Sequence, residues 1–583
     1  SEKGAQPMYA NNHLPCIVNG ELYNYRPIRK RLLDEGASFK GESDAEIVPH
    51  LYSRNGKDFI REIEGMFAIA LWDDESETLN LYRDRFGIKP MYYTWQNDTL
   101  YFGSELKAIL CHEEVEKEAD IQAIHDFLSL SYIPEPATGF RNIYMLKPGH
   151  RLEVSKNGLK IEPYWSFSAS AADKASEPAI LDKLQKELDE AVMAQTVADA
   201  PLGAFLSGGI DSSTVVNSLT KGMDGKELKT FTVKFPDRDF DESAYARRIS
   251  EILGTNHFEF EIRQGEGDPE LIKKLLQHFD QPYADSSCIP TFLISQQIRE
   301  QVKVALSGDG GDEVMAGYHL FWYFDYIRQL SKLPSPLLKL ARGMIGMAPL
   351  GPDRKRQYKK VLDLAQLNEA DLLCRLGSYL SEAQKSDLYK KPLSSVQPTS
   401  RLFRFDPEDA EKDTYQKISK VLFRVSLTGD MLKKVDMMSM LAGIEVRVPL
   451  LHESYVEYAL TTPPHLKMKN RKGKWALREL LKRNLPEDIV EKKKSGFAIP
   501  LDRLVNPEMI KFIRTTLLSD DSRILGLIRK DVIEEWIEDF ISGKIKSVEH
   551  SREGLYQRIF MLLSLELWMV KNKFNFENIN AGR

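Results

Sequence analysis

The stretch PLGAFLSGGIDSSTVVNSL, residues 201–219, runs apolar, then small and polar, then apolar again. This pattern predicts a short strand, a loop and a helix. Gly208 and Gly209 allow a tight turn and the close approach of a ligand. The first N–H groups of the helix, together with the hydroxyls of Ser207 and Ser212, favour an anion.

Asp211 is the one carboxylate in this loop, and it would repel a phosphate unless it holds a Mg²⁺ ion that bridges to the phosphates. The alternative is a tight turn in which the aspartate caps a helix. The loop lacks the G-K-[ST] of a Walker A motif.

A second loop repeats the same pattern in VKVALSGDGGDEVMAGY, residues 302–318. Here Ser307, Gly308, Asp309 and Asp312 follow an apolar strand. In a doubly wound sheet, ligands bind at the carboxyl ends of the strands. Two such loops are therefore expected to face one site, with Asp211 and Asp312 as a pair of Mg²⁺ ligands.

The composition of the whole chain narrows the class of protein to which these loops belong. The chain has 583 residues, 42% apolar and 28% charged, which is enough for two or more globular domains. A net charge of −6 argues against a general nucleic-acid binder. No apolar run is long enough to span a membrane, and four scattered cysteines favour a reducing, cytoplasmic setting.

The pattern along the chain predicts two domains. Residues 1–165 are rich in short β-type runs broken by turns, and residues 166–179 form a polar linker. Strands then alternate with helices, which predicts a parallel α/β sheet in residues 180–583, mostly helical from about residue 320.

The loop LSGGIDSS resembles the pyrophosphate loop of ATP pyrophosphatases, and its pairing with LSGDGGDE resembles the synthetase domain of glutamine-hydrolysing asparagine synthetases. The stretches FDQPYADSSCIPTFLIS, VDMMSMLAGIEVRVPLL and KWALRELLKRNLPEDIVEKKKSGFAIPL agree. So do NGELYNY, SDAEIVPHLY, GMFAIALWD and RDRFGIKPMYY in the first domain. The resemblance implies an N-terminal-nucleophile-type layered glutaminase domain, followed by an α/β ATP-pyrophosphatase domain with a helical C-terminal part.

The resemblance also implies a reaction and roles for residues. ATP and Mg²⁺ would activate a carboxylate as an acyl-adenylate, which ammonia converts to an amide. Leu206 joins the pyrophosphate loop, and Val233 lies where the adenine-side strand runs, with a plain core position as its alternative. Lys474 would face the acyl phosphate, unless it is one solvated charge among neighbouring lysines. Glu445 is a catalytic or substrate-side candidate. The family continues P-F-L-D where this chain has His452, which is expected to be structural or exposed.

In the first domain, the resemblance assigns glutamine binding to Asn19, Gly20, Glu21 and Asp44. For the dipeptide Asn-Gly alone, a hairpin turn is the alternative. The family opens with Met-Cys-Gly, which is absent, so the chain as written is expected to use ammonia only. Either a complete enzyme has been truncated, or the natural protein lacks glutaminase activity. Cys16 is expected to be a buried apolar side chain.

The favoured acceptor is aspartate, which would give asparagine, AMP and pyrophosphate. One alternative is a sugar carboxylate or another acid in surface-polysaccharide synthesis. A second alternative is a non-catalytic regulatory relative. Glutamine or ammonia and the acid are the expected partners, with no nucleic acid and no membrane, and a homodimer is a further expectation.

Overall fold

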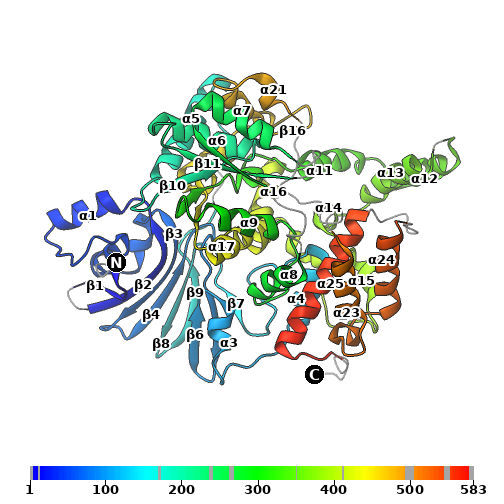
Figure 1. Cartoon of the computed structure of the whole chain (residues 1–583), viewed down its shortest axis with the longest axis horizontal. Helices are drawn as coiled ribbons and strands as arrows, with labels where there is room; N and C mark the ends of the chain where they lie inside the picture. Colours follow the sequence, from blue (N-terminus) through cyan, green and yellow to red (C-terminus); the bar gives the residue numbers. More distant parts are fainter. Residues whose placement is uncertain are drawn as a thin grey trace.

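The computed structural model describes most of the chain. The described residues are 4–10, 13–167, 172–235, 241–261, 268–349, 351–409, 413–492, 505–543 and 552–576. Their helices and strands are arranged as two antiparallel sheets at the N-terminal end, a parallel sheet, and a large helical part (Figure 1). The predicted α/β fold class is confirmed.

The N-terminal half contains a six-stranded antiparallel sheet of order β1-β2-β3-β4-β8-β9. Its strands are β1 (Met8–Ala10), β2 (His13–Leu22), β3 (Gly65–Asp73), β4 (Thr78–Arg83), β8 (His150–Ser155) and β9 (Gly158–Pro163). A three-stranded sheet has the order β6 (Thr99–Gly103), β5 (Tyr92–Gln96) and β7 (Tyr144–Met145).

Helices α1 (Tyr25–Asp34) and α2 (Ile47–Asn55) share an apolar core with the six-stranded sheet, and a second core joins the two sheets. Strand β3 is therefore buried on both faces. Its sequence GMFAIALWD is apolar almost throughout, and does not alternate as a strand with one solvated face would.

The parallel sheet has the order β12-β11-β10-β13-β14. Its strands are β10 (Leu202–Phe205), β11 (Lys229–Lys234), β12 (Asn256–Glu261), β13 (Val304–Leu306) and β14 (Glu445–Arg447). Strands β10 and β13 are direct neighbours, with Leu202 opposite Val304 and Ala204 opposite Leu306. The two loops predicted to carry chemistry therefore leave the sheet side by side.

The remaining helices form in amphipathic or fully apolar stretches. Helix α5 shows the pattern: Pro178 lies in its first turn, and its buried side chains recur every three or four residues from Ile180 to Val192. The helices that connect the strands are α3 (Leu106–Leu110), α4 (Ile121–Leu130), α5 (Glu177–Ala194), α6 (Ile210–Gly222), α7 (Ser243–Leu253), α8 (Pro269–His278), α9 (Cys288–Ile298) and α10 (Gly311–Val314).

The helices after the fourth parallel strand, β13, make up the helical part. They include α11 (His319–Leu330), α12 (Ser335–Met347), α13 (Pro352–Leu364), α14 (Glu369–Gly377), α15 (Glu382–Leu388), α16 (Thr414–Leu422), α17 (Leu432–Leu441), α18 (Glu453–Thr461), α19 (Pro464–Lys467), α20 (Trp475–Leu481), α21 (Glu487–Val490), α23 (Pro507–Leu518), α24 (Lys530–Ser542) and α25 (Arg552–Asn572). Within the described chain, no helix has both the length and the hydropathy needed to cross a membrane.

One of the hydrophobic cores contains residues from both predicted domains. Phe127 and Phe140, from the N-terminal half, are fully buried in the same cluster as Tyr283, Phe321 and Trp568. The predicted linker, residues 166–179, lies mostly between β9 and α5, where the described residues form no helix or strand, but its last three residues belong to the first turn of α5. The boundary at residue 165 stays a prediction, since core packing crosses it.

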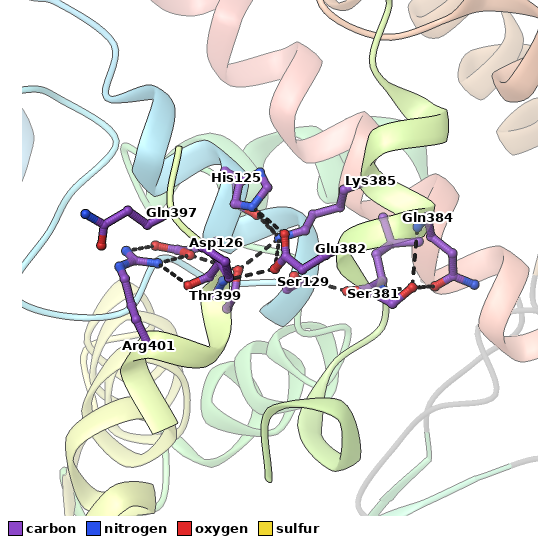
Figure 2. A network of polar contacts seen from close by, with 12 residues as sticks. His125, Asp126, Ser129, Ser381, Glu382, Gln384, Lys385, Gln397, Thr399 and Arg401 are labelled. Atoms are coloured by element: carbon purple, nitrogen blue, oxygen red, sulfur yellow. Dashed lines mark hydrogen bonds and ion pairs between the residues drawn. The ribbon is translucent and has the colours of Figure 1, made fainter. Parts of the chain in front are cut away.

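A buried polar network strengthens the contact between the N-terminal half and the helical part (Figure 2). Lys385 on α15 is fully buried, and its Nζ donates to Glu382 Oε1 at 3.0 Å and to Thr399 Oγ1 at 2.9 Å. The same Nζ lies 2.8 Å from His125 Nε2 on α4. Next to it, Asp126 on α4 pairs with Arg401. Helix α4 of the N-terminal half is thus bound to the helical part by charge-assisted hydrogen bonds.

Candidate active site

A cavity with a volume of about 650 Å³ lies at the carboxyl ends of the parallel strands. Its walls include both glycine-rich loops, strand β11, helix α9, the start of α11 and the hairpin of β15 (Met468–Lys469) and β16 (Lys472–Gly473). This is the position at which open α/β sheets bind ligands.

The first loop is held by its own serines. Ser207 Oγ lies 3.0 Å from Ser212 Oγ, the Ser207 N–H donates to Ser212 Oγ at 3.2 Å, and the Gly209 N–H donates to Ser207 Oγ at 3.3 Å. Gly208 has φ +76°, and a Cβ there would lie 3.0 Å from Tyr245 Cβ. A glycine is therefore required at 208 on both conformational and steric grounds.

The second loop lies directly against the first. A Cβ added to Gly308 would lie 2.7 Å from Asp211 Cβ and 2.7 Å from the Ser212 nitrogen. Gly310 adopts φ +89° and precedes α10, which begins at Gly311. The absence of side chains at Gly308 and Gly311, whose added Cβ atoms would both collide with Asp211, is what lets the two loops make contact.

Lys474 joins the loops, because its Nζ forms ion pairs with both Asp211 and Asp312, the latter at 2.7 Å. The residue has a left-handed backbone (φ 59°) between β16 and α20, and its N–H donates to the carbonyl of Met315 at 3.0 Å. Burial alone would lower the pKa of Lys474, but Asp211 and Asp312 outweigh burial and raise the pKa above its usual value. Three segments far apart in sequence thus place one cation between two carboxylates.

The two carboxylates fit a magnesium ion. Mg²⁺ is usually held by one or two carboxylates together with waters and substrate phosphates. Asp211 and Asp312 are close enough to contact the same ammonium group, and each side chain is about one-fifth exposed to the cavity. Among the described residues, no cluster of three or more metal-ligating side chains occurs, so an ion here would take its remaining ligands from water and substrate.

The other residues predicted to bind ATP divide into two groups. Val233, Ser307 and Asp309 line the cavity, and Ser307 Oγ donates to Asp309 Oδ2 at 2.6 Å. Leu206 is fully buried behind the loop, where its N–H donates to the carbonyl of Phe231 at 2.8 Å. Leu206 therefore supports the loop from the core.

The structure places Glu445 outside the lining of the cavity. It lies on β14, where the neighbouring Val446 faces the cavity, and its carboxylate accepts from Arg447 Nε at 2.7 Å. His452 is also away from the cavity walls, 3.6 Å from Glu64, as expected for a structural residue.

Several cavity residues were not identified from the sequence. Asp285 and Lys434 form an ion pair of 2.8 Å on the cavity wall. Glu313 is buried, and its Oε1 accepts from Tyr318 Oη at 2.7 Å. Burial, followed by the nearby Asp312, raises the pKa of Glu313 to about 7. A signal existed for Asp285 and Glu313, because both lie within the quoted family-like stretches; Lys434 directly precedes one.

The residues predicted to bind glutamine lie on and beside β2. Asn19, Gly20 and Glu21 are within the strand, so the Asn-Gly dipeptide forms no hairpin turn here. Gly20 has φ +143°, and a Cβ would collide with the carbonyl of Met66 on β3. Asn19 Nδ2 donates to Ser104 Oγ at 2.9 Å, and Asp44 Oδ2 accepts from the Leu22 N–H at 2.8 Å.

Arg447 connects this strand to the cavity. Its guanidinium is 3.2 Å from Glu21 Oε2, and its carbonyl accepts from the N–H of Ser307 in the second loop at 2.9 Å. Burial, followed by Glu445 and Asp44, raises the pKa of Glu21 to about 7, although Arg447 opposes the shift. Cys16, also on β2, is 1% exposed, as expected for a buried apolar side chain.

Comparison with known families agrees with this geometry. The asparagine synthase model matches residues 183–570, and a glutamine amidotransferase domain model matches residues 1–165. The chain belongs to the asparagine synthase family and is a ligase of the glutamine-dependent, amide-forming class.

Its relatives carry more than one kind of name. Asparagine synthetase (glutamine-hydrolyzing) 1 of Bacillus subtilis is 31% identical, over 96% of this chain and 87% of that protein. Asparagine synthetase (glutamine-hydrolyzing) 3 of the same organism is 28% identical, over 92% and 84%. A protein of Penicillium rubens named amidase chyE is 28% identical, over 92% and 85%.

Proposed function

We propose that this protein uses ATP to convert aspartate to asparagine through an acyl-adenylate, with nitrogen from glutamine or ammonia. The observation that carries this proposal is the ion-paired group of Asp211, Asp312 and Lys474 at the contact of the two loops. Family membership and the names of the asparagine synthetase relatives support the reaction class and the acceptor.

In the proposed reaction, an oxygen of the aspartate side chain attacks the α-phosphorus of ATP, and the bond from this phosphorus to the α,β-bridging oxygen breaks, which releases the β and γ phosphates as pyrophosphate. Ammonia then attacks the acyl carbon, the carbon–oxygen bond to AMP breaks, and one proton is lost. A bound Mg²⁺ would neutralise charge on the phosphates. Ser207, Ser212 and the loop N–H groups would hold the pyrophosphate.

Lys474 and Glu313 take the remaining roles. When Asp211 and Asp312 contact a metal ion that is bound to the phosphates, Lys474 Nζ can donate to the acyl-phosphate oxygens instead, where charge develops. Glu313, with its pKa near 7, is suited to accept the proton that the attacking ammonia loses. Asn19, Gly20, Glu21 and Asp44 would hold glutamine, and hydrolysis of its side-chain amide, in which water adds to the amide carbon and the carbon–nitrogen bond breaks, would give glutamate and that ammonia.

A second candidate acceptor is a sugar carboxylate or a related acid. The cavity wall includes Trp322, over which the guanidinium of Arg471 lies at 5.1 Å from the ring centroid. An indole and a guanidinium are well suited to pack on a sugar ring and to pair with an acid group. The relative named amidase shows that names in this family extend beyond asparagine synthetase.

The test is pyrophosphate release by the full chain with ATP, Mg²⁺ and ammonia, with aspartate compared against a panel of uronates. Aspartate is expected to give the strongest stimulation. Release with a uronate and not with aspartate would transfer the proposal to the second acceptor.

The site itself is tested by Asp211→Asn. This variant should abolish pyrophosphate release with any acid while keeping the thermal unfolding midpoint, and full activity in it would refute the site. A chain inactive with every acid would match the non-catalytic alternative.

A further inference from the structure

Helices α12 and α13 form a hairpin that projects from the body of the molecule (Figure 1). Its helices pack on one another, and α13 also contacts α11. Leu338 is the only residue of α12 that is buried. The hairpin therefore exposes most of its surface, and it lies outside the cavity and outside the glutamine-binding strand.

One face of α12 is apolar and exposed. Leu337, Leu340, Met344 and Met347 are 53%, 60%, 53% and 82% exposed. Their spacing of three or four residues puts them on one stripe, which is about 15 Å long at the rise of a helix. Leu333, at 47%, precedes the stripe. We call the four side chains on α12 the apolar stripe.

The stripe is exceptional for this protein. The four residues Leu337, Leu340, Met344 and Met347, together with Tyr358 on α13, are the five most exposed large hydrophobic side chains in the described part of the chain. Single exposed apolar residues are ordinary, whereas a contiguous row marks an interaction surface.

The charges around the stripe are almost all positive. Residues 332–364 contain eight lysines and arginines against two aspartates, a formal charge of +6 in a chain whose total is −6. Lys332, Lys339, Arg342 and Arg354 are exposed, and Arg342 pairs with Asp363. A second copy of the chain packed face to face would bring two such clusters together, which like-charge repulsion disfavours.

We propose that this hairpin binds the surface of an anionic lipid bilayer. An exposed apolar stripe flanked by lysine and arginine is the pattern of helices that lie in the plane of a membrane interface. The stripe would enter the boundary of headgroups and acyl chains, and the cations would contact the anionic headgroups. The attachment is peripheral and reversible, and it replaces the expectation of no membrane partner.

The test is co-sedimentation of the full chain with vesicles of phosphatidylcholine alone and of phosphatidylcholine mixed with phosphatidylglycerol. Binding is expected to the mixed vesicles and to weaken as salt is added, since exposed charges are screened. Leu340→Gln with Met344→Gln should abolish sedimentation. Lys339→Gln with Arg354→Gln should weaken the partition coefficient by about 25-fold, at about fivefold for each cation.

Matched controls separate the hairpin from general surface effects. Ile252→Gln with Val570→Gln changes two side chains that are 42% and 49% exposed elsewhere on the molecule. Lys156→Gln with Lys391→Gln removes two exposed cations elsewhere. Both controls should bind vesicles as the unmodified chain does, and all variants should keep its thermal unfolding midpoint.

Three outcomes would overturn the proposal. The first is no binding to mixed vesicles, and the second is equal binding to neutral and mixed vesicles. The third is a self-associating chain, seen by sedimentation velocity, whose Leu340→Gln/Met344→Gln variant becomes monomeric while no form binds vesicles. That result would assign the stripe to a second copy of the chain.

Discussion

At the scale of single residues, Lys474 concentrates the chemistry of the proposed site. The residue is 5% exposed, and two carboxylates face its Nζ. Lys474→Met leaves these carboxylates without their cation, so pyrophosphate release should fall by about 100-fold or more. Added Mg²⁺ should raise the unfolding temperature of this variant more than that of the unmodified chain, because the ion compensates the same carboxylates.

The matched control is Lys472→Met on the same hairpin, where the side chain is 54% exposed and pairs with Glu491. An exposed pair contributes little, so activity should change by less than about threefold. Unaltered turnover in Lys474→Met would contradict the role of this residue.

Glu313 gives a pH dependence with a definite sign. Its pKa is raised to about 7 by burial and by Asp312, so the carboxyl is mostly protonated at pH 6 and mostly ionised, and able to accept a proton, at pH 8. At a constant concentration of free ammonia, kcat/KM should rise through pH 7 and then level off. Glu313→Gln should lower the rate and flatten this profile; a profile that keeps its inflection would assign the ionisation to another group.

At the scale of elements, the contact of the two loops depends on Gly308. Gly308→Ala puts a methyl group 2.7 Å from Asp211 Cβ, so the loops must separate. Pyrophosphate release is expected to slow by about tenfold or more, since a displacement of catalytic groups by about 1 Å lowers the rate by at least this factor. Gly351→Ala, where a Cβ meets nothing within 4 Å, is the control and should remain active. Equal activities would show that the loops tolerate separation.

The network around Lys385 tests how α4 is attached to α15. Lys385→Met keeps an unbranched stem of four atoms but removes the ammonium group, and so leaves His125, Glu382 and Thr399 without their buried partner. Removing one member of such a network is expected to lower the free energy of unfolding by about 2–4 kcal/mol. Chemical denaturation measures this, with the exposed Lys186→Met as control. A change below about 1 kcal/mol would mean that the neighbours find other partners.

The sequence was informative where the local pattern and the function coincide. Both glycine-rich loops follow short apolar strands, and these strands, β10 and β13, are neighbours in the sheet, so the two loops do face one cavity. The sequence was uninformative where the role of a residue depends on partners that are distant along the chain. Glu445 lies beside Glu21 because Arg447 pairs with both, and the Asp285–Lys434 pair joins residues 149 positions apart. Neither contact has a local signature.

At the scale of the whole molecule, one hydrophobic core extends across the predicted boundary at residue 165. Phe127 and Phe140 are buried among helices of the second half. A fragment of residues 1–165 is therefore expected to expose these side chains, and to aggregate or to bind a hydrophobic dye. The same fragment produced together with residues 172–583 should be soluble and should co-purify. A soluble, dye-negative fragment alone would show that the shared core is dispensable.

The neighbouring positions of β10 and β13 carry an evolutionary consequence. The described part of the segment between β10 and β13 contains β11, β12 and four helices, yet the spacing of the loops is fixed by backbone hydrogen bonds between adjacent strands. Insertions and substitutions in that segment, or in the helical part after β13, can reshape the cavity wall without moving Asp211 relative to Asp312. A descendant protein can thus accept a new acid through substitutions in the cavity wall, while it inherits the arrangement of Asp211 and Asp312 unchanged.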